Sequence, residues 1–231
     1  MKELITVAVL LLIGYAFGLI QTGYFLSKIK GVDIKHQGSG NSGATNSLRV
    51  MGKKAGIIVL VGDLLKAYIP CMAIRFIYGE PGLGLQPEMM YAYLAAIGFG
   101  VVLGHNFPFF MGFKGGKGVA STTGLAMAMD WRILLVGFIL FVVIVAATRY
   151  VSLGSTVGVA TLTIMMSIFC ALGQYGLCPI GSYIFYGIGI LLFLLCAVRH
   201  HANYKRLLNG TENKLGAKKK EAEAESSESA K

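Results

Sequence analysis

"LITVAVLLLIGYAFGLIQTGYF", residues 4–25, decides the fold class of this 231-residue chain. A helix needs ~20 predominantly apolar residues in a row to cross a bilayer, and this stretch supplies them. Only Lys2 and Glu3 lead into it as charged residues, and it contains no convincing small-residue cleavage site. The sequence therefore predicts a retained first membrane span rather than a signal peptide.

The composition of the whole chain agrees with a membrane protein. Apolar residues make up 55% of the sequence and charged residues 14%, and the mean hydropathy is +0.66. A soluble domain of this size needs far more polar surface. The sequence therefore predicts an integral membrane protein that forms one domain.

Six further apolar stretches follow the first, separated by polar segments. They cover 55–78, 90–105, 118–130, 132–148, 153–173 and 180–198. We therefore expect an all-α integral membrane protein with about seven transmembrane helices. The stretch 118–130 is short for a ~30 Å hydrocarbon core, so it is either a full span or a half-span. A five-span arrangement, with 118–130 and one neighbour re-entrant, stays open.

Basic residues mark one side of this expected bundle. The net charge is +10, and of the 21 Lys and Arg, six lie between residues 28 and 54 and eight lie from Arg199 onward. Short loops rich in Lys and Arg face the cytoplasm. Both arrangements therefore place the N-terminus outside and the C-terminus in the cytoplasm. No aromatic-studded basic fold accompanies this charge, so it does not indicate nucleic-acid binding.

The C-terminal stretch "AKKKEAEAESSESAK", residues 217–231, has no apolar residue larger than alanine. A segment of this composition cannot bury enough apolar surface to fold. We expect residues 1–216 to form the membrane domain and 217–231 to be a disordered, charged cytoplasmic tail.

Three polar segments on the predicted cytoplasmic side hold most of the residue types that perform chemistry. The first is "GSGNSGATNSLR", residues 38–49. It contains a G-x-G-x-x-G pattern that begins with Gly38 and Gly40, but no buried strand precedes it, so a dinucleotide site is not indicated. Glycines let backbone N–H groups converge on an anion, and the side chain of Arg49 suits phosphate. The alternative is a flexible turn. The other candidate donors of the segment are Ser39, Asn41, Thr45 and Asn46.

The second segment is "GHNFPFFMGFKGGKGVASTTG", residues 104–124. It is not a nucleotide P-loop, because Gly112 lies one residue too close to Lys117 and no hydroxyl residue follows that lysine. Lysines, glycine N–H groups and the start of the next helix still predict an anion site. A basic loop that only marks the cytoplasmic side is the alternative. The candidate residues are Lys114, Gly115, Gly116, Lys117 and Gly118.

The third segment is "RHHANYKRLLNGTENK", residues 199–214. We expect a short helix that carries His200, His201, Asn203 and Arg206 and ends at Asn209-Gly210. Adjacent histidines point to different helix faces, so the segment predicts no metal pair. Taken alone, it is typical of a basic cap at the end of a membrane span.

The predicted span 55–78 is interrupted by Asp63 and Lys66. Asp63 and Lys66 are three residues apart, so they share a helix face and can form an ion pair. Asp63 lies about 13 Å in from residue 54 at the usual helical rise. An intramembrane carboxylate favours a functional role, and a structural tie to a loop residue is the equal alternative.

The four cysteines, at positions 71, 170, 178 and 196, mostly lie inside apolar runs, at spacings that match no zinc site. We expect them to be small packing residues without a redox role.

Taken together, the three polar segments resemble those of the bacterial membrane acyl-phosphate:glycerol-3-phosphate acyltransferases. The stretches "GSGNSGATN…R", "GHNFPFF…FKGGKGVA" and "HHANYKRLLNGTENK" stand in that family's order and spacing, and the resemblance extends to about residue 216. Ser42 and Tyr204 depart from the family's pattern, but neither is a reacting group.

The resemblance implies a reaction on the cytoplasmic side of the bacterial inner membrane. A fatty acyl group moves from acyl phosphate to the 1-hydroxyl of glycerol 3-phosphate, which gives lysophosphatidic acid and inorganic phosphate in the first step of phospholipid synthesis. It implies no cofactor, and the partners would be the two substrates, membrane lipids and an upstream acyl-phosphate synthase. The implied catalytic residues are Ser39, Arg49, Lys117, His200 and Asn203.

The residues themselves agree with a phosphate leaving group. Glycerolipid acyltransferases with soluble donors use a histidine with an aspartate five positions later, and none of the four histidines has one. We expect mainly electrostatic and positional catalysis, with either His200 or a phosphate oxygen of the donor as the base.

Two other classes of membrane protein compete with an enzyme. A transporter for phosphorylated solutes would place its polar groups on broken helices near the midplane and often shows repeated halves. A structural or scaffold protein would leave three dense polar segments without a role. The polar segments lie in predicted cytoplasmic loops, which favours the enzyme.

Overall fold

The computed structural model describes residues 1–79 and 86–216, and all regular structure within those ranges is helical. The predicted disordered tail, 217–231, lies outside the described residues. The helices are α1 Lys2–Gly18, α2 Thr22–Ile29, α3 Ala44–Met51, α4 Lys53–Gly79, α5 Met90–Asn106, α6 Val119–Met129, α7 Trp131–Thr148, α8 Val151–Ala171, α9 Pro179–Arg199 and α10 His201–Leu208.

Six helical segments of the described ranges are long and apolar enough to cross a membrane. They run over Lys2–Ile29, Lys53–Tyr78, Pro87–Met111, Trp131–Thr148, Val151–Ala171 and Pro179–Arg199. The predicted all-α membrane fold is confirmed. The seventh apolar stretch forms only α6, whose eleven residues rise about 16 Å, roughly half of a hydrocarbon core.

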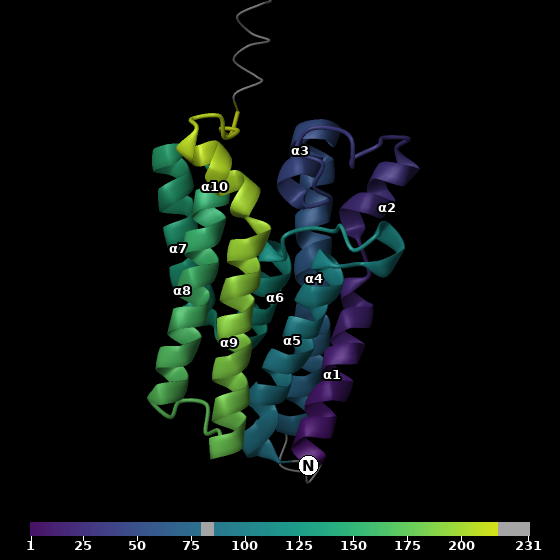
Figure 1. The fold of residues 1–231 in the computed structure, drawn as a ribbon. Helices are drawn as coiled ribbons and strands as arrows, with labels where there is room; N and C mark the ends of the chain where they lie inside the picture. Colours follow the sequence, from purple (N-terminus) through teal and green to yellow (C-terminus); the bar gives the residue numbers. More distant parts are fainter. Residues whose placement is uncertain (80–85, 217–231) are drawn as a thin grey trace, which may run out of the picture.

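The short helix α6 lies alongside one half of α4. Near the start of α6, Ser121 Oγ donates to the backbone carbonyl of Asp63 at 3.1 Å. At its end, Arg75 Nη1 donates to the carbonyl of Ala128 at 2.8 Å. Helix α6 therefore begins at the depth of Asp63 and continues from there toward the end of the bundle where the chain starts (Figure 1).

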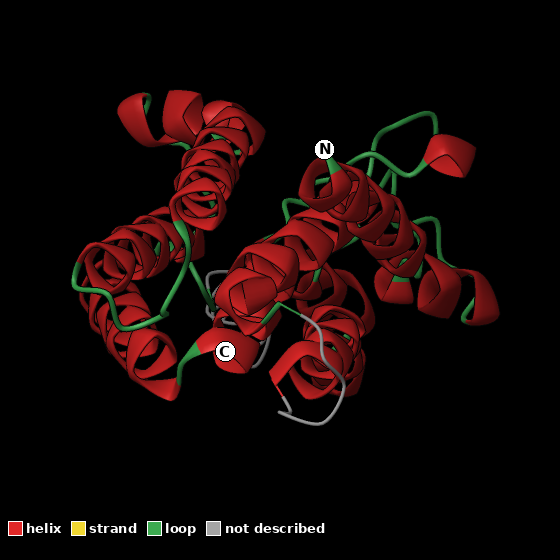
Figure 2. Ribbon diagram, turned by 90° about the horizontal axis from the view of Figure 1, so that it is seen from below, coloured by secondary structure: helices red, strands yellow, loops and turns green. Residues whose placement is uncertain are grey.

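The elements that hold the three polar segments gather at one end of the bundle. The N-terminus lies at the opposite end from α3 and α10 (Figure 1). Seen along the bundle, α7, α8 and α9 form an arc beside the group built on α1, α4 and α5 (Figure 2). The loops predicted to share one side of the membrane therefore do lie on one side of the molecule.

Helices α1 and α5 pack backbone to backbone through glycines. A Cβ atom on Gly14 would lie 2.1 Å from the carbonyl oxygen of Ile97, and one on Gly104 would lie 2.2 Å from that of Tyr15. Gly18 and Gly100 make equally close approaches. Spacing of small residues by four is the usual means of close helix packing in membranes.

The predicted first span at 4–25 is confirmed, since it lies within the candidate span Lys2–Ile29, but its helix is interrupted. Helix α1 ends at Gly18 and α2 begins at Thr22. The break leaves backbone carbonyls without helical partners inside the bundle, where they must be satisfied by other groups. Lys66 Nζ donates to the carbonyl of Ile20 at 2.8 Å, and Gln21 Nε2 donates to that of Gly18 at 3.0 Å.

Candidate active site

A single cavity of about 1000 Å³ connects the three polar segments. Nine of the fourteen sequence-predicted site residues line it. These are Ser39, Asn41, Thr45, Asn46, Arg49, Lys117, Gly118, His200 and Asn203. The other five, Gly38, Gly40, Lys114, Gly115 and Gly116, do not line it.

The glycine loop before α3 is held by its own hydrogen bonds. Asn46 Oδ1 accepts from the N–H of Ser39 at 2.9 Å, and its amide donates to the carbonyl of Gln37 at 3.1 Å. Gly38 and Gly40 have φ of +62° and +69°, in the left-handed region that favours glycine. The glycines therefore shape the loop, whereas the side chain of Arg49, one helical turn after Asn46, lines the cavity.

The loop that leads to Lys117 is held by hydrogen bonds to the end of α5 and to Arg199. The N–H groups of Gly115 and Gly116 donate to the carbonyls of Asn106 and His105 at 3.1 and 3.0 Å. Their own carbonyls accept from Arg199, with distances of 2.8 to 3.0 Å. These two glycine amides are thus already bonded, which differs from the expectation that they face an anion.

The start of α6 instead brings helix N-terminal N–H groups to the cavity, a geometry that suits an anion. The first N–H groups of a helix have no intrahelical acceptor, and Gly118, Val119 and Ala120 all line the cavity. Lys117 precedes them and is half-buried. Burial, opposed by Glu212 and assisted by Arg206, lowers the pKa of Lys117 to about 8.

His200 lies at the junction of α9 and α10 and is 1% exposed. Its Nδ1 lies 2.9 Å from the carbonyl oxygen of Cys196 and donates to it. Nε2 is therefore the unprotonated nitrogen of the neutral ring. Burial and the charge of Lys117 lower the pKa of His200 to about 4, so the ring is neutral at pH 7.

A buried carboxylate organises the α10 side of the cavity. Glu212 accepts from Ser152 Oγ at 2.9 Å, from Asn203 Nδ2 at 2.7 Å and from Arg206 Nε at 2.7 Å. Burial opposes its charge, but these hydrogen bonds hold the pKa of Glu212 below its ordinary value. The side-chain oxygen of Asn203 in turn accepts from Lys117 Nζ.

The remaining wall of the cavity is apolar and follows helices α4, α7 and α8. Its large apolar residues are Leu60, Leu64, Leu134, Leu135, Phe138, Phe141, Val145, Val159 and Leu162. The cavity therefore has a cationic, polar end and a long apolar part. This combination suits a ligand with an anionic head and a hydrocarbon chain.

The described ranges contain no cluster of three or more His, Cys, Asp or Glu side chains arranged to hold a metal ion. The predicted contact between Asp63 and Lys66 is confirmed, with 2.9 Å between Oδ1 and Nζ.

Comparison with known proteins decides the family. The family model described as glycerol-3-phosphate acyltransferase matches residues 8–210. This chain belongs to the glycerol-3-phosphate acyltransferase family. The resemblance inferred from the three polar segments is thereby confirmed.

Relatives in this family match the chain over nearly its whole length. The glycerol-3-phosphate acyltransferase of Clostridioides difficile is 40% identical over 220 residues, which cover 94% of this chain and 99% of the relative. That of Halalkalibacterium halodurans is 41% identical over 213 residues, covering 91% and 96%.

A family member of known structure has the same fold. The crystal structure of PlsY (YgiH), an integral membrane glycerol 3-phosphate acyltransferase, in its glycerol 3-phosphate form superposes with a TM-score of 0.75. It is 33% identical and covers 95% of this chain and 98% of its own. Its lysophosphatidic acid form gives a TM-score of 0.73 at 36% identity, covering 91% and 95%.

The site residues predicted from the sequence do not include several residues that line the cavity. Glu212, Arg206 and His105 stand within the quoted polar segments, and all three contribute to its wall. The only signal for Glu212 was a carboxylate nine residues after Asn203, within a segment dominated by cations. Its hydrogen-bond partners come together only where α8 and α10 meet in the folded protein.

Proposed function

We propose that this protein transfers a fatty acyl group from an acyl phosphate to the 1-hydroxyl of glycerol 3-phosphate, releasing lysophosphatidic acid and inorganic phosphate. The observation that carries the proposal is the cavity itself, which joins Arg49 and Lys117 at one end to a continuous apolar wall. An acyl phosphate has this division between an anionic head and a chain. The names of the two PlsY forms supply the acceptor and the lipid product by analogy.

Charge explains how the site promotes the reaction. Two anionic substrates repel each other, and Arg49 and Lys117 hold them together in a partly buried site. The glycerol oxygen attacks the acyl carbonyl carbon, the bond from that carbon to the phosphate oxygen breaks, and the phosphate leaves with the electron pair. The same two cations stabilise the charge that develops on the departing phosphate. Ser39 and Asn203 orient substrate oxygens.

The proton of the attacking hydroxyl has two candidate acceptors. His200 offers Nε2 because Nδ1 is bonded to the carbonyl of Cys196. Its pKa of about 4 keeps it neutral but makes it a weak base. If His200 is the base, His200→Gln removes nearly all turnover while substrate affinity is retained. Turnover of about a tenth of wild type would support transfer to a phosphate oxygen instead.

The other candidate residues divide by position. We assign direct substrate contacts to Asn41, Thr45 and Gly118, which line the cavity, whereas Asn46 holds the glycine loop through both ends of its amide. Loop-shaping roles in phosphate binding fall to Gly38, Gly40, Gly115 and Gly116. Lys114 is exposed and contributes positive charge that attracts anionic substrates toward the site.

Donor class is the sharpest test of the proposal. Purified protein in lipid nanodiscs is mixed with glycerol 3-phosphate and palmitoyl phosphate, palmitoyl-CoA or palmitoyl-acyl carrier protein, and lysophosphatidic acid is measured. Product from palmitoyl phosphate alone, abolished in Lys117→Ala, supports the proposal. Product from a thioester instead would overturn the donor, and no product from a folded protein would overturn the reaction.

We also propose that the site faces the cytoplasm of a bacterial inner membrane, with residues 1–216 as the membrane domain. The face that carries α3 and α10 holds the basic loops, which favours the cytoplasmic side. A cysteine replacing exposed Lys205 should react with an impermeant maleimide only after the cells are opened. An acyl-phosphate synthase must supply the donor.

A further inference from the structure

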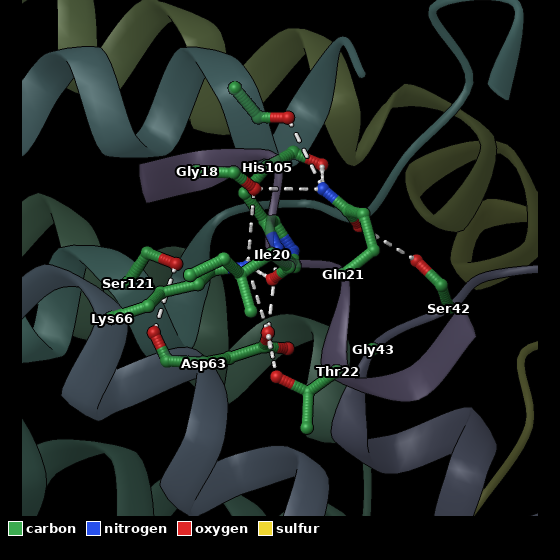
Figure 3. A network of polar contacts seen from close by, with 12 residues as sticks. Gly18, Ile20, Gln21, Thr22, Ser42, Gly43, Asp63, Lys66, His105 and Ser121 are labelled. Atoms are coloured by element: carbon green, nitrogen blue, oxygen red, sulfur yellow. Dashed lines mark hydrogen bonds and ion pairs between the residues drawn. The ribbon is translucent and has the colours of Figure 1, made fainter. Parts of the chain in front are cut away.

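Three ionisable side chains form a buried cluster beside the cavity (Figure 3). The side chains of Asp63 and Lys66 are each 2% exposed, and that of His105 is 5% exposed. Charges buried at membrane depth persist only when they are paired and hydrogen-bonded. The opposite charges of Asp63 and Lys66 neutralise each other. This ion pair does not need His105 for charge balance, and yet His105 lies in contact with it.

The Lys66 ammonium has three N–H donors, and apart from the carbonyl of Gly18 at 3.5 Å, three acceptors surround it. They are Asp63 Oδ1 at 2.9 Å, the carbonyl of Ile20 at 2.8 Å and His105 Nδ1 at 2.7 Å. The break between α1 and α2 supplies the Ile20 carbonyl, so this break is part of the arrangement (Figure 3). An ammonium group has no lone pair with which to accept a hydrogen bond.

The geometry around Lys66 fixes the tautomer of His105. Because the ammonium only donates, Nδ1 must accept, and the single proton of the neutral ring resides on Nε2. Asp63 Oδ1 lies 3.7 Å from Nδ1, which is too long for a competing hydrogen bond. Lys66 therefore selects which edge of the imidazole acts as a donor.

The Nε2 edge of His105 faces the loop that carries Lys117. A Cβ atom on Gly116 would lie 1.8 Å from Nε2, so the ring edge packs directly against this glycine. His105 lines the same cavity as Lys117 and Gly118. Within the described ranges, no protein group bonds to Nε2. An N–H donor without a partner thus stands beside the cation and the helix start that form the proposed anion site.

We propose that Nε2–H of His105 donates a hydrogen bond to the substrate phosphate bound beside Lys117, and that Asp63 and Lys66 are the positioning pair that keeps the proton on Nε2. This assignment rests on the proposed function, because it requires a phosphate in the cavity. It explains why a buried ion pair stands behind a neutral histidine. His105 becomes a substrate-binding residue, and Lys66 acts through it.

Two substitutions of His105 distinguish the role of Nδ1 from that of Nε2. The side-chain oxygen of asparagine reproduces Nδ1, so His105→Asn keeps the acceptor for Lys66 and removes the cavity donor. The amide of glutamine reaches the Nε2 position, so His105→Gln keeps the donor and gives up the contact with Lys66. His201 is exposed and lies outside the cavity, so His201→Asn is the matched control.

The experiment is isothermal titration calorimetry of each variant with glycerol 3-phosphate and with inorganic phosphate. We expect His105→Asn to weaken both affinities about tenfold or more, as loss of a hydrogen bond to a charged group does. His105→Gln should stay within about threefold of wild type, and His201→Asn should be unchanged. Equal losses in both His105 variants, or a loss only in His105→Gln, would overturn the donor role. Wild-type protein that binds neither ligand would instead contradict the proposed function itself.

A measurement on wild-type protein covers the case in which a variant fails to fold. In protein labelled with 15N-histidine, the imidazole nitrogen shifts should show His105 protonated at Nε2, and that signal should move when inorganic phosphate is added. Asp63→Asn combined with Lys66→Met removes both buried charges together and should release the ring into a mixture of tautomers. A proton found on Nδ1 in wild type, or an Nε2 signal that ignores phosphate, would overturn the proposal.

Discussion

Glu212 holds Asn203 in place, since its carboxylate accepts a 2.7 Å hydrogen bond from the side-chain amide of Asn203. With its amide donating to Glu212, the Asn203 side chain presents its oxygen to Lys117. The position of Lys117, which we propose to be catalytic, therefore depends on a carboxylate that is nearly buried. Arg206 and Ser152 complete the same cluster.

Replacing this carboxylate by an amide should weaken both the fold and the reaction. Ser152 and Asn203 donate to one oxygen of Glu212 and Arg206 to the other, so the NH₂ group of Glu212→Gln must face donors on one of the two sides and leave them unsatisfied. We expect the free energy of unfolding to fall by about 1–3 kcal/mol and kcat/KM to fall at least about tenfold. Thermal unfolding and the acyltransfer assay measure the two effects. Glu88→Gln, at an exposed glutamate, is the matched control, and Glu212→Gln activity within twofold of wild type would contradict the role of Glu212.

The pH profile of kcat/KM for glycerol 3-phosphate should have limbs near pH 4 and pH 8. This parameter reports the free enzyme. Burial lowers the pKa of Lys117 to about 8, so Lys117 loses its positive charge as the pH rises through this value, and its affinity for phosphate falls. As the pH drops through about 4, His200 gains a proton, so Nε2 can no longer accept one.

Arginine at position 117 tests the alkaline limb. A guanidinium stays charged at all accessible pH values, so Lys117→Arg should move the fall in kcat/KM well above pH 8, whatever its effect on the maximum. The ionisation of glycerol 3-phosphate is the same for both proteins and cancels in the comparison. An alkaline limb that stays in place would assign it to a group other than Lys117.

Loop glycines that pack against backbone atoms of another segment should not tolerate a side chain. A Cβ atom on Gly115 would lie 2.1 Å from the carbonyl oxygen of His105, which a helix end cannot move aside. We expect Gly115→Ala to displace Lys117 and lower kcat/KM at least about tenfold. Gly187→Ala in α9 is the control, because nothing lies within 4 Å of its added Cβ. Equal activity of the two variants would show that the loop adapts.

The sequence predicted the features that depend on local composition. Apolar runs predicted all six long spans, whereas the stretch 118–130 was left open between a full span and a half-span, and α6 has only the shorter length. The polar segments were predicted to lie on one side of the membrane because Lys and Arg are enriched in short cytoplasmic loops. These properties are carried by neighbouring residues, so they can be seen without a structure.

The features that were missed depend on contacts between distant residues. Gly18 has a low helix propensity, but Gly14 stands inside α1 without ending it, so glycine alone does not predict the break. The break is stabilised by Lys66, 46 residues beyond Ile20. The glycine loops were expected to offer backbone N–H groups, yet those of Gly115 and Gly116 are bonded to the end of α5. Whether a backbone N–H group bonds to a ligand or to another part of the chain depends on which carbonyl groups the packing brings next to it.

The length of the acyl chain should be set by residues far from the cations. Cavity-lining residues of α7 extend from Trp131 to Val145, a rise of about 21 Å. The Val145 end lies near the polar cluster, because the carbonyl of Arg149 accepts from the N–H of Leu215 at 2.8 Å. Leu134 therefore lies toward the distant, apolar end.

Filling that end should shorten the preferred donor. In Leu134→Trp, the indole occupies space that the last carbons of a long chain would use, and each buried CH₂ contributes about 0.8 kcal/mol. We expect kcat/KM for palmitoyl phosphate to fall about tenfold or more, while that for decanoyl phosphate stays within about threefold. Leu191→Trp, at an exposed position on α9 outside the cavity, should change neither. Equal losses for both donors would mean that the chain ends elsewhere, and the apolar wall of α7 would then serve packing rather than selection.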